Sequence, residues 1–455
     1  MSKLKKIADL ETKYPVNEIS FKGLSVWVVI RLYYSYLLSG KTPVKGSIFL
    51  SIKKLSYIFY GFFNYFGKYD FIAFTNASER KLIHNMMYDR LDFLPKTYKT
   101  LYFELPIPKH YHRKKIPTRY IVSKLPIYGL VWVISKLIFG KINPSSLWLL
   151  IKKEGDIDFN EYQTVKRYYA QFLVGKFLYF LYKPKIFFVT PSFTNMGFIR
   201  AFKEKGTKVI EMQHGIINKE HIAYNYQNKV NNLSFPDYLF SFGLHEKDTF
   251  ENNYFIAKSH VLPTGHFYLD WLKENFKPNP KILDILKHYN TSVTFTAQVI
   301  YDKAIIPLLF QIAKKNKDTV FLYVPRVKKN KYDELIGKPD NIIIVDYIDC
   351  YNTIMHTDFH STIYSTCALE APVLGKQNIL IDFKGLSTKY YKNVLNDKNV
   401  TLFIKTDNEF SYAIQNMHKI PCEEIIKRSN KIIISGFKKN LKENLQIILN
   451  EIFEK

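Results

Sequence analysis

Short apolar runs alternate with longer mixed segments along most of the chain. The clearest runs lie at residues 185–190, 208–212, 292–296, 319–324 and 359–364, and helix-like segments separate several of them. Strands and helices that alternate in this way are typical of parallel βαβ units. The pattern therefore predicts an α/β protein with Rossmann-like sheets.

Helical patterns dominate two other regions. Residues 1–60 are expected to be mainly helical, with 24–38 and 47–60 the clearest segments, and residues 118–182 are helix-rich. Between these regions, an apolar strand at 70–75 is expected to lead into a helical run that continues through residue 90.

The chain of 455 residues is long enough for two domains. The Lys-, Pro- and Asn-rich stretch 273–281 is predicted to link them, so that the domains span 1–272 and 273–435. The final region reads as helical with a break at Gly436.

Basic residues outnumber acidic residues. Lysine and arginine total 66 against 40 aspartates and glutamates, which gives a net charge of +26. This surplus predicts an anionic partner, such as lipid head groups, a nucleotide, an acidic glycan or nucleic acid. Because the lysines are spread over the whole chain and do not alternate with stacking aromatics on one face, no nucleic acid partner is expected.

Cysteine and histidine spacing gives no sign of a metal site. The three cysteines are scattered, which is typical of a reduced cytosolic protein. The basic loop at 106–117 carries His110 and His112, and we expect it to be an exposed anion-binding loop.

Three segments resemble membrane-active sequence. The first fifteen residues lack the apolar core of a secretory signal. The apolar stretches 24–38, 125–140 and 166–183 are interrupted or flanked by cations and fall short of about 20 clean apolar residues. Each one is expected to be a buried helix. Together with the basic surplus, they predict peripheral contact with an anionic membrane and no spanning helix.

The stretch from 357 to 382 predicts an anion site. Ser365 and Thr366 stand where a strand ends and a helix begins, and parallel sheets bind ligands at that edge. Their N–H groups and hydroxyls are suited to hold a diphosphate, and Glu370, one turn further on, is suited to accept hydrogen bonds from a ribose. Helix capping by the two hydroxyls is the simpler alternative. Gln298 and Arg326 follow two other strands, and Arg326 could pair bidentately with a leaving phosphate.

A second group of polar residues follows the strand at 208–212. The strand ends in Gln213, His214 and Gly215. A glycine there lets the backbone approach a ligand closely. A histidine with a pKa near neutrality can remove the proton of an acceptor hydroxyl as that oxygen attacks. His214 is the first candidate base, although a lone histidine is more often structural.

Two motifs carry a resemblance to known families. Glu370-Ala371-Pro372 followed by Leu374-Gly375-Lys376 resembles the EAPxLGK signature of UDP-N-acetylglucosamine 2-epimerases, which have the GT-B fold. His214-Gly215 followed by Lys219 is similar to the HGTPLK motif of CDP-glycerol glycerophosphotransferases, whose histidine is the proposed base. Residues 216–218 differ from that motif.

Two other segments resemble conserved blocks of the glycerophosphotransferases. The spacing from Asp358 through Ser365-Thr366 to Glu370 is similar to the first block, and Thr264, Gly265 and Asp270 match part of the second. The Pro-Arg pair of the second block is Phe267-Tyr268 here, which disfavours phosphodiester chemistry.

The resemblance implies a GT-B fold with two Rossmann-like domains facing each other across a cleft, and with extra N-terminal helices. The first domain would take the acceptor and the second the nucleotide-sugar donor, and the helix 436–455 would pack back on the first domain. Metal and cofactor are not required. Glu79, in the loop after the first strand, becomes an acceptor contact or second candidate base; a solvated helix start is the alternative. His266 becomes a sugar or phosphate contact, or else a satisfied loop histidine.

These expectations combine into one functional hypothesis. The chain is predicted to be a bacterial glycosyltransferase that moves a sugar from a UDP, CMP or CDP donor to a capsular or lipopolysaccharide glycan or a lipid-linked acceptor, with inversion, at the inner face of the cytoplasmic membrane. Three alternatives remain: a polyol-phosphate transferase, a UDP-sugar 2-epimerase, and a basic nucleic-acid- or membrane-binding scaffold. The epimerase is disfavoured because no carboxylate-rich site is evident in the first domain.

Overall fold

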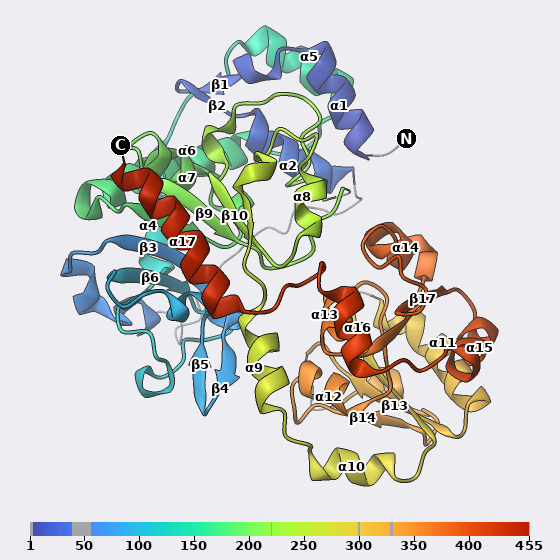
Figure 1. The fold of residues 1–455 in the computed structure, drawn as a ribbon. Coiled ribbons are helices and arrows are strands. Elements are labelled where there is room, and N and C mark those ends of the chain that lie inside the picture. Colours follow the sequence, from blue (N-terminus) through green and yellow to red (C-terminus); the bar gives the residue numbers. More distant parts are fainter. Residues whose placement is uncertain (1–2, 39–55, 220, 299–300, 328–330, 455) are drawn as a thin grey trace. The chain divides into compact units, whose positions relative to one another are not determined.

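The computed structural model describes residues 3–38, 56–219, 221–298, 301–327 and 331–454. The chain divides into two compact units (Figure 1). Unit 1 comprises Met1–Ser241, Glu246–Thr264 and Lys438–Lys455, and unit 2 comprises Phe242–His245 and Gly265–Phe437. Each unit contains its own parallel sheet, so the predicted two-sheet α/β architecture is confirmed.

In the described residues, unit 1 contains a seven-stranded parallel sheet with the order β11-β10-β9-β8-β3-β6-β7. Its strands are β3 (Phe71–Asn76), β6 (Thr100–Leu105), β7 (Ile121–Ser123), β8 (Ile186–Val189), β9 (Lys208–Met212), β10 (Tyr238–Ser241) and β11 (Val261–Pro263). The first strand, β3, lies between β6 and β8. Nearly every residue of β3 and β8 is buried, as expected for a parallel sheet covered on both faces.

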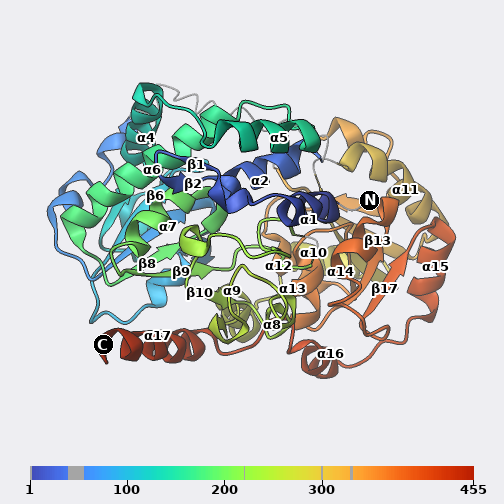
Figure 2. The same cartoon turned by 90° about the horizontal axis from the view of Figure 1, so that it is seen from above.

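Helices pack on the sheet of unit 1 and on one another. The helices are α1 (Lys3–Lys13), α2 (Trp27–Leu37), α4 (Leu125–Leu137), α5 (Ser145–Gly155), α6 (Glu161–Tyr182) and α7 (Met196–Lys203). Helix α6 packs against α7, α4 and α2 (Figure 2). Phe74 of β3 makes edge contacts with Phe103, Phe187 and Phe198, which ties three strands to α7.

The helix predicted at 24–38 is confirmed from Trp27 onward, and it is largely buried. Most of the segment predicted at 47–60 lies outside the described residues. Arg31, the charge that interrupts this apolar segment, forms a buried ion pair with Glu11 at 2.8 Å. Its guanidinium also donates to the carbonyl of Ile222 at 2.6 Å and lies over the ring of Tyr226. Because the arginine is satisfied inside unit 1, α2 is part of the core.

The C-terminal helix α17 (Phe437–Phe453) lies along the sheet of unit 1 (Figure 1). The Asn444 amide donates to the carbonyl of Pro263 at the end of β11 at 2.7 Å. Glu451 accepts a hydrogen bond from Tyr238 of β10 and pairs with Lys208 of β9 at 3.5 Å. The break before the helix, at Gly436, is confirmed; this glycine has φ +87°.

The sheet of unit 2, within the residues described, has six parallel strands in the order β14-β13-β12-β15-β16-β17. They are β12 (Thr291–Thr296), β13 (Thr319–Val324), β14 (Ile342–Ile344), β15 (Phe359–Ser361), β16 (Gln377–Ile381) and β17 (Thr401–Ile404). The central β12 pairs with β13 from Thr291–Thr319 to Thr296–Val324. This is the doubly wound order of a dinucleotide-binding fold.

Unit 2 buries apolar side chains on both faces of its sheet. The helices are α9 (Phe267–Asn275), α10 (Pro280–Leu286), α11 (Asp302–Lys315), α12 (Cys350–His356), α13 (Cys367–Val373), α14 (Leu386–Tyr391), α15 (Asp407–Asn416) and α16 (Cys422–Ser429). Along β13, Phe321 and Tyr323 join the core formed with α11 and α15. Val320 and Leu322 join the core on the α10 side. This alternation follows from the two-residue period of a strand.

One predicted element is wrong. The segment after β3 is not helical through residue 90 but forms a hairpin of β4 (Lys81–Ile83) and β5 (Met86–Tyr88). The turn residues His84 and Asn85 have φ +45° and +67°, which matches a two-residue hairpin loop. Because the turn lacks the usual glycine, its sequence gave little sign of a hairpin.

Candidate active site and donor site

Both sheets reverse their strand order beside the strand that comes first in the sequence of that sheet. The reversal lies between β3 and β8 in unit 1 and between β12 and β15 in unit 2. The carboxyl ends of strands at such a point are the usual place for a ligand in doubly wound folds. Most of the predicted site residues follow strands at these two edges.

In unit 1, Gln213 fixes the turn that follows β9. Its backbone N–H donates to Phe240 on β10 at 3.0 Å. Its side-chain amide donates to the carbonyl of Gly215 at 2.9 Å and to Glu246 Oε1 at 2.7 Å. A Cβ placed on Gly215 would meet no atom within 4 Å. The hydrogen bonds of Gln213 therefore fix the turn, and the space beside Gly215 is free of atoms from the described residues.

Arg90 joins this turn to the loop after β3. It comes from the short helix η5 (Arg90–Phe93), and its guanidinium forms an ion pair with Glu79 Oε2 at 2.7 Å. The same guanidinium donates to the backbone carbonyl of Gln213. Glu79 ends the short helix η4 (Ala77–Glu79). The two predicted catalytic candidates, Glu79 and His214, are thus brought to one place by a residue that the sequence did not single out.

The electrostatics of this place favour a neutral His214. Burial lowers the pKa of His214 below its ordinary value, Glu79 opposes this shift, and Arg90 adds to it. The ring of Phe193 lies 6.1 Å from the His214 ring, centroid to centroid. A neutral imidazole at neutral pH is able to accept a proton, so the environment suits a general base.

A second histidine, His221, belongs to the same environment. Burial, and then the neighbouring His214, lower the pKa of His221 to about 4. Its ring lies 6.1 Å from Phe193 and 4.8 Å from Tyr224. Among the described residues, its Nδ1 has no hydrogen-bond partner.

A buried carboxyl group, that of Glu211, is linked to His221 through Tyr224. Glu211, on β9, accepts hydrogen bonds from the Ser192 N–H at 3.0 Å and from the Tyr224 hydroxyl at 2.7 Å. Burial raises the pKa of Glu211 above its ordinary value. Its second oxygen, Oε2, has no partner within the part of the chain that the structure describes. We refer to Glu79, Arg90, Glu211, His214 and His221 as the His214 cluster.

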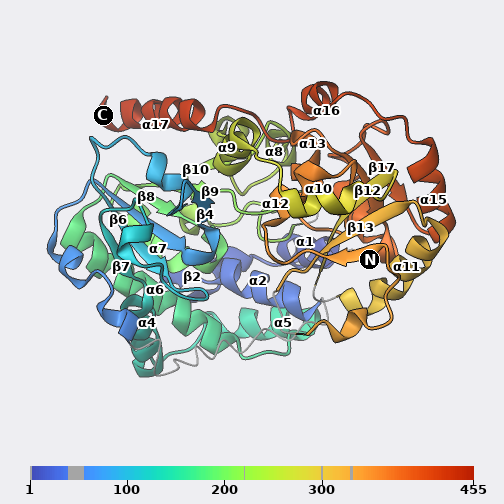
Figure 3. The ribbon, with the colours of Figure 1, turned by 90° about the horizontal axis from the view of Figure 1, so that it is seen from below.

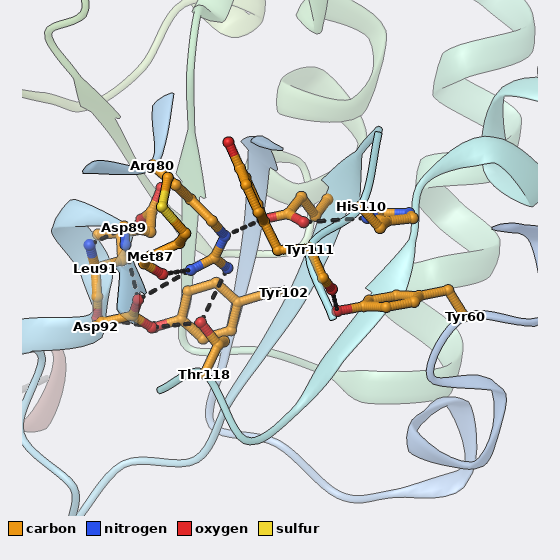
Figure 4. A network of polar contacts seen from close by, with 11 residues as sticks. Tyr60, Arg80, Met87, Asp89, Leu91, Asp92, Tyr102, His110, Tyr111 and Thr118 are labelled. Atoms are coloured by element: carbon orange, nitrogen blue, oxygen red, sulfur yellow. Dashed lines mark hydrogen bonds and ion pairs between the residues drawn. The ribbon is translucent and has the colours of Figure 1, made fainter. Parts of the chain in front are cut away.

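A buried polar network around Arg80 (Figure 4) holds the loop between Glu79 and Arg90. Arg80 donates to Glu104 at 2.5 Å, to Asp92 at 3.1 Å and to Thr118 at 2.9 Å. It also donates to the carbonyl of Met87 in the hairpin at 3.0 Å. Burial raises the pKa of Asp92 to about 6, against the opposing effect of Arg80. The network connects the hairpin, η5 and β6 around one guanidinium.

His110 belongs to this network, contrary to the exposed loop expected from the sequence. It is buried, with Nδ1 3.1 Å from Glu104 Oε1 and its ring stacked on Tyr60 at 4.1 Å. Glu104 lies on β6 and draws the histidine inward. His112 is exposed, as expected. Lys219 is also exposed.

In unit 2, the predicted donor residues follow β12, β13 and β15. The N–H of Gln298 donates to Asp302 Oδ1 at 2.8 Å, at the start of α11. Arg326 is exposed after β13. Ser365 is buried, and its hydroxyl accepts a long hydrogen bond of 3.4 Å from the backbone N–H of Cys367. The Thr366 side chain makes no capping hydrogen bond. The cap alternative is therefore weak for Ser365 and wrong for Thr366.

Glu370 and His266 both contact Tyr351. Glu370 is buried in α13, and its Oε1 accepts a hydrogen bond from the Tyr351 hydroxyl at 3.0 Å. The Tyr351 ring lies 6.3 Å from His266, which stacks on Phe267 at 5.7 Å and 3°. His266 is therefore part of an aromatic cluster with Phe242 at 5.3 Å.

Comparison with known proteins bears on the fold. No family model and no curated protein sequence matches the chain. A putative UDP-N-acetylglucosamine 2-epimerase from Listeria monocytogenes is 12% identical and has a TM-score of 0.52, with 86% of this chain and 98% of that chain covered. The S. aureus MnaA–UDP co-structure is 12% identical with a TM-score of 0.51, over 85% and 96%.

The chain has the GT-B fold. A structure of the wall teichoic acid polymerase TagF is also similar, at 13% identity and a TM-score of 0.45, over 85% of this chain and 89% of that chain.

At two positions of this GT-B protein, the backbone conformation and close packing require glycine. Gly375, in the Leu374-Gly375-Lys376 run, has φ +77°, and a Cβ there would lie 1.9 Å from the Cys422 sulfur. Gly265, a predicted site residue, has φ +90°, and its Cβ would lie 2.3 Å from the carbonyl oxygen of Ile434. Both positions need glycine for conformation and for close approach.

Sequence reasoning missed Arg90, Glu211, His221 and Tyr351. Arg90 was hidden by the helix expected there, although Asp89 and Asp92 form a capping box around it that could have indicated a helix start. Tyr351 and Glu370 are far enough apart in sequence that only the packing of α12 on α13 joins them.

Within the described residues, none of the helices combines the length and the apolar character that crossing a membrane requires. The same residues contain no group of three or more histidine, cysteine, aspartate or glutamate side chains arranged to hold a metal ion.

Proposed function

We propose that the protein is a nucleotide-sugar-dependent glycosyltransferase of the GT-B type, with His214 as the base. The observation that carries the proposal is the neutral, partly buried imidazole beside the open turn at Gly215, flanked by the Glu79–Arg90 ion pair. A neutral His214 accepts the proton of an acceptor hydroxyl as that oxygen attacks the anomeric carbon, and direct displacement inverts that carbon. No metal or cofactor takes part in the proposed reaction.

Unit 2 supplies the proposed donor site. Gln298, Arg326, Ser365, Thr366 and Glu370 follow strands that meet at one edge of a doubly wound sheet. We assign the diphosphate or phosphate of a UDP, CDP or CMP donor to the Ser365-Thr366 N–H groups and to Arg326, and the ribose to Glu370. Charge on the leaving nucleotide is stabilised by these donors as it develops.

The proposed acceptor is a glycan of the bacterial surface, capsular or lipopolysaccharide, or its lipid-linked precursor. The net charge of +26 supports an anionic acceptor or membrane. The proposed place of action is the inner face of the cytoplasmic membrane, with peripheral attachment.

A thermal-shift panel tests the donor site. CMP, UDP, CDP, GDP and their sugar and polyol conjugates are compared on wild type and Glu370→Gln. A ligand that binds only the native state at about 100 times its Kd stabilises it by about 2.7 kcal/mol. Tyr351→Phe is the matched control, because it removes the hydrogen bond to Glu370 but keeps the carboxylate.

We expect one nucleotide class to raise the melting temperature of wild type and of the Tyr351→Phe control, and Glu370→Gln to lose most of the shift. Selective binding of CDP-glycerol or CDP-ribitol would redirect the assignment to polyol-phosphate transfer. Equal shifts with all anions that fade with added salt would refute a nucleotide site and leave the scaffold alternative.

A UDP-sugar 2-epimerase is the second candidate. Epimerisation requires acid and base groups that take and return a C–H proton, and the sequence showed no carboxylate-rich site for this in the first domain. The structure supplies Glu79 and Glu211 in the His214 cluster. Incubation with UDP-N-acetylglucosamine in D2O without acceptor tests this candidate: deuterium at C2 supports the epimerase, and an unchanged C2 argues against it.

A further inference from the structure

Helix α4 exposes an apolar face to the outside of unit 1. Its inner side, including Leu125, Ile127 and Val131, is buried. Its outer side is also apolar: Trp132 is 63% exposed and Leu137 69%. A helix that is apolar on all sides normally has partners on all sides. The sequence predicted a buried helix here, and the structure buries only half of it.

Two neighbouring segments extend this face. The short helix η3 (Phe62–Phe66) exposes Phe63 and Phe66, and the last turns of α6 expose Phe180. Tyr65 of η3 donates to the carbonyl of Ser123, just before α4, at 2.7 Å and accepts from Tyr182 of α6 at 2.8 Å.

Helix α4 packs on α6 (Figures 2 and 3). Phe139, after α4, is 76% exposed and lies 5.6 Å from Lys166 of α6. We refer to Phe63, Phe66, Trp132, Leu137, Phe139 and Phe180 as the apolar face.

Within the three segments that carry the apolar face, all charged side chains are basic. Residues 56–69, 121–141 and 162–185, which carry the face, contain no aspartate or glutamate. Their exposed cations are Lys68, Lys136, Lys141, Arg167, Lys176, Lys183 and Lys185. Exposed aromatics with lysines and no carboxylates are characteristic of surfaces that insert into the head-group region of anionic bilayers. By contrast, most of the apolar helix α2 is buried in the core, so an apolar sequence does not by itself explain why α4 is exposed.

We propose that the apolar face docks unit 1 onto a bilayer containing anionic phospholipid. Trp132, Phe139, Phe63 and Phe66 enter the head-group region, while the lysines pair with lipid phosphates. This inference rests on the proposed function in that it names the surface used at the membrane. It is tested by lipid binding alone, whereas the donor site is tested by nucleotide binding, so the two can fail separately.

Vesicle flotation of the full chain tests the proposal. Phosphatidylcholine vesicles with and without phosphatidylglycerol are compared for wild type, a Trp132→Ser/Leu137→Ser/Phe139→Ser variant and a Lys136→Gln/Lys141→Gln variant. Tyr412→Ser, at an exposed aromatic of α15 in unit 2, is the matched control. We expect wild type and control to float with anionic vesicles. The triple variant should lose at least about tenfold in apparent binding, and each lysine removed about fivefold.

A second measurement does not require the triple variant to fold. Brominated lipid should quench the fluorescence of wild type more than that of Trp132→Phe, because Trp132 enters the bilayer. Equal flotation of wild type and the triple variant, or equal quenching of wild type and Trp132→Phe, overturns the proposal. It is also overturned if light scattering shows a wild-type dimer that the triple variant loses, because the face would then bind a second copy of the chain.

Discussion

The low pKa of His221 predicts a measurable pH dependence of stability in unit 1. The pKa of this histidine is about 4, against an ordinary value of 6.5. Between these two values the unfolded chain binds a proton that the folded chain excludes, so stability rises with pH through this window and is lost as pH falls. About 2.5 pKa units at roughly 1.4 kcal/mol each correspond to about 3 kcal/mol between pH 7 and pH 4.

His221→Phe keeps an aromatic ring beside Phe193 and Tyr224 and removes the titrating group. Both proteins are made with Trp271→Phe, because Trp271 is the one tryptophan in unit 2 and the other three belong to unit 1. Urea unfolding followed by tryptophan fluorescence then reports on unit 1.

We expect the free energy of unfolding of His221→Phe, relative to that of the His221 protein, to rise by about 3 kcal/mol from pH 7 to pH 4. Other groups, such as Asp92, titrate in both proteins and cancel in the difference. A difference that stays flat across this range would refute a buried, neutral His221.

Three further predictions concern single contacts. Arg90 lowers the pKa of His214 and Glu79 raises it, so Arg90→Ala should raise this pKa and Glu79→Gln should lower it further. NMR titration of the imidazole measures the two shifts. Shifts of the same sign would contradict the positions of Arg90 and Glu79 beside His214. Asn378→Leu should destabilise unit 2 by about 3 kcal/mol in chemical denaturation, because the buried amide donates to Ala368 and accepts from His360. Asn408→Leu, at an exposed asparagine, is the control. An equally small effect of both substitutions would argue against a stabilising role for the Asn378 hydrogen bonds. Gly375→Ala should cost about 2 kcal/mol or more because of its φ of +77° and the Cys422 sulfur. Cys422→Ala should relieve part of that cost, and an unchanged melting temperature for Gly375→Ala would contradict the clash.

The parallel sheets were predictable because their strands carry a strong local signal. A parallel strand buried on both faces must be apolar throughout, and β8, β9, β12 and β13 were recognised on that basis. The β4–β5 hairpin was not, because its turn is formed by His84 and Asn85 in a conformation that is usually marked by glycine. The GT-B fold followed from the strand pattern together with two motifs.

The individual candidates were also visible in the sequence, but their partners were not. His214 follows a strand and Glu370 follows a strand–helix junction, so position along the chain was enough to single them out. Their surroundings depend on residues distant in sequence: Arg90 reaches the carbonyl of Gln213, and Tyr351 reaches Glu370. The cysteines appeared scattered, yet the sulfurs of Cys350 and Cys367 lie 4.0 Å apart.

Burial was the least predictable property. The apolar segments of α2 and α4 look alike in sequence, and each is interrupted by one cation. Arg31 is enclosed because Glu11 and two carbonyls satisfy its charge inside unit 1, whereas Lys136 stays on the outer side of α4 among exposed apolar residues. Apart from the β4–β5 hairpin, the sequence by itself determined which of the core segments are strands and which are helices, since that choice depends on local periodicity. Only the tertiary structure decided which charges are neutralised and which apolar faces are covered, because both depend on partners from distant parts of the chain.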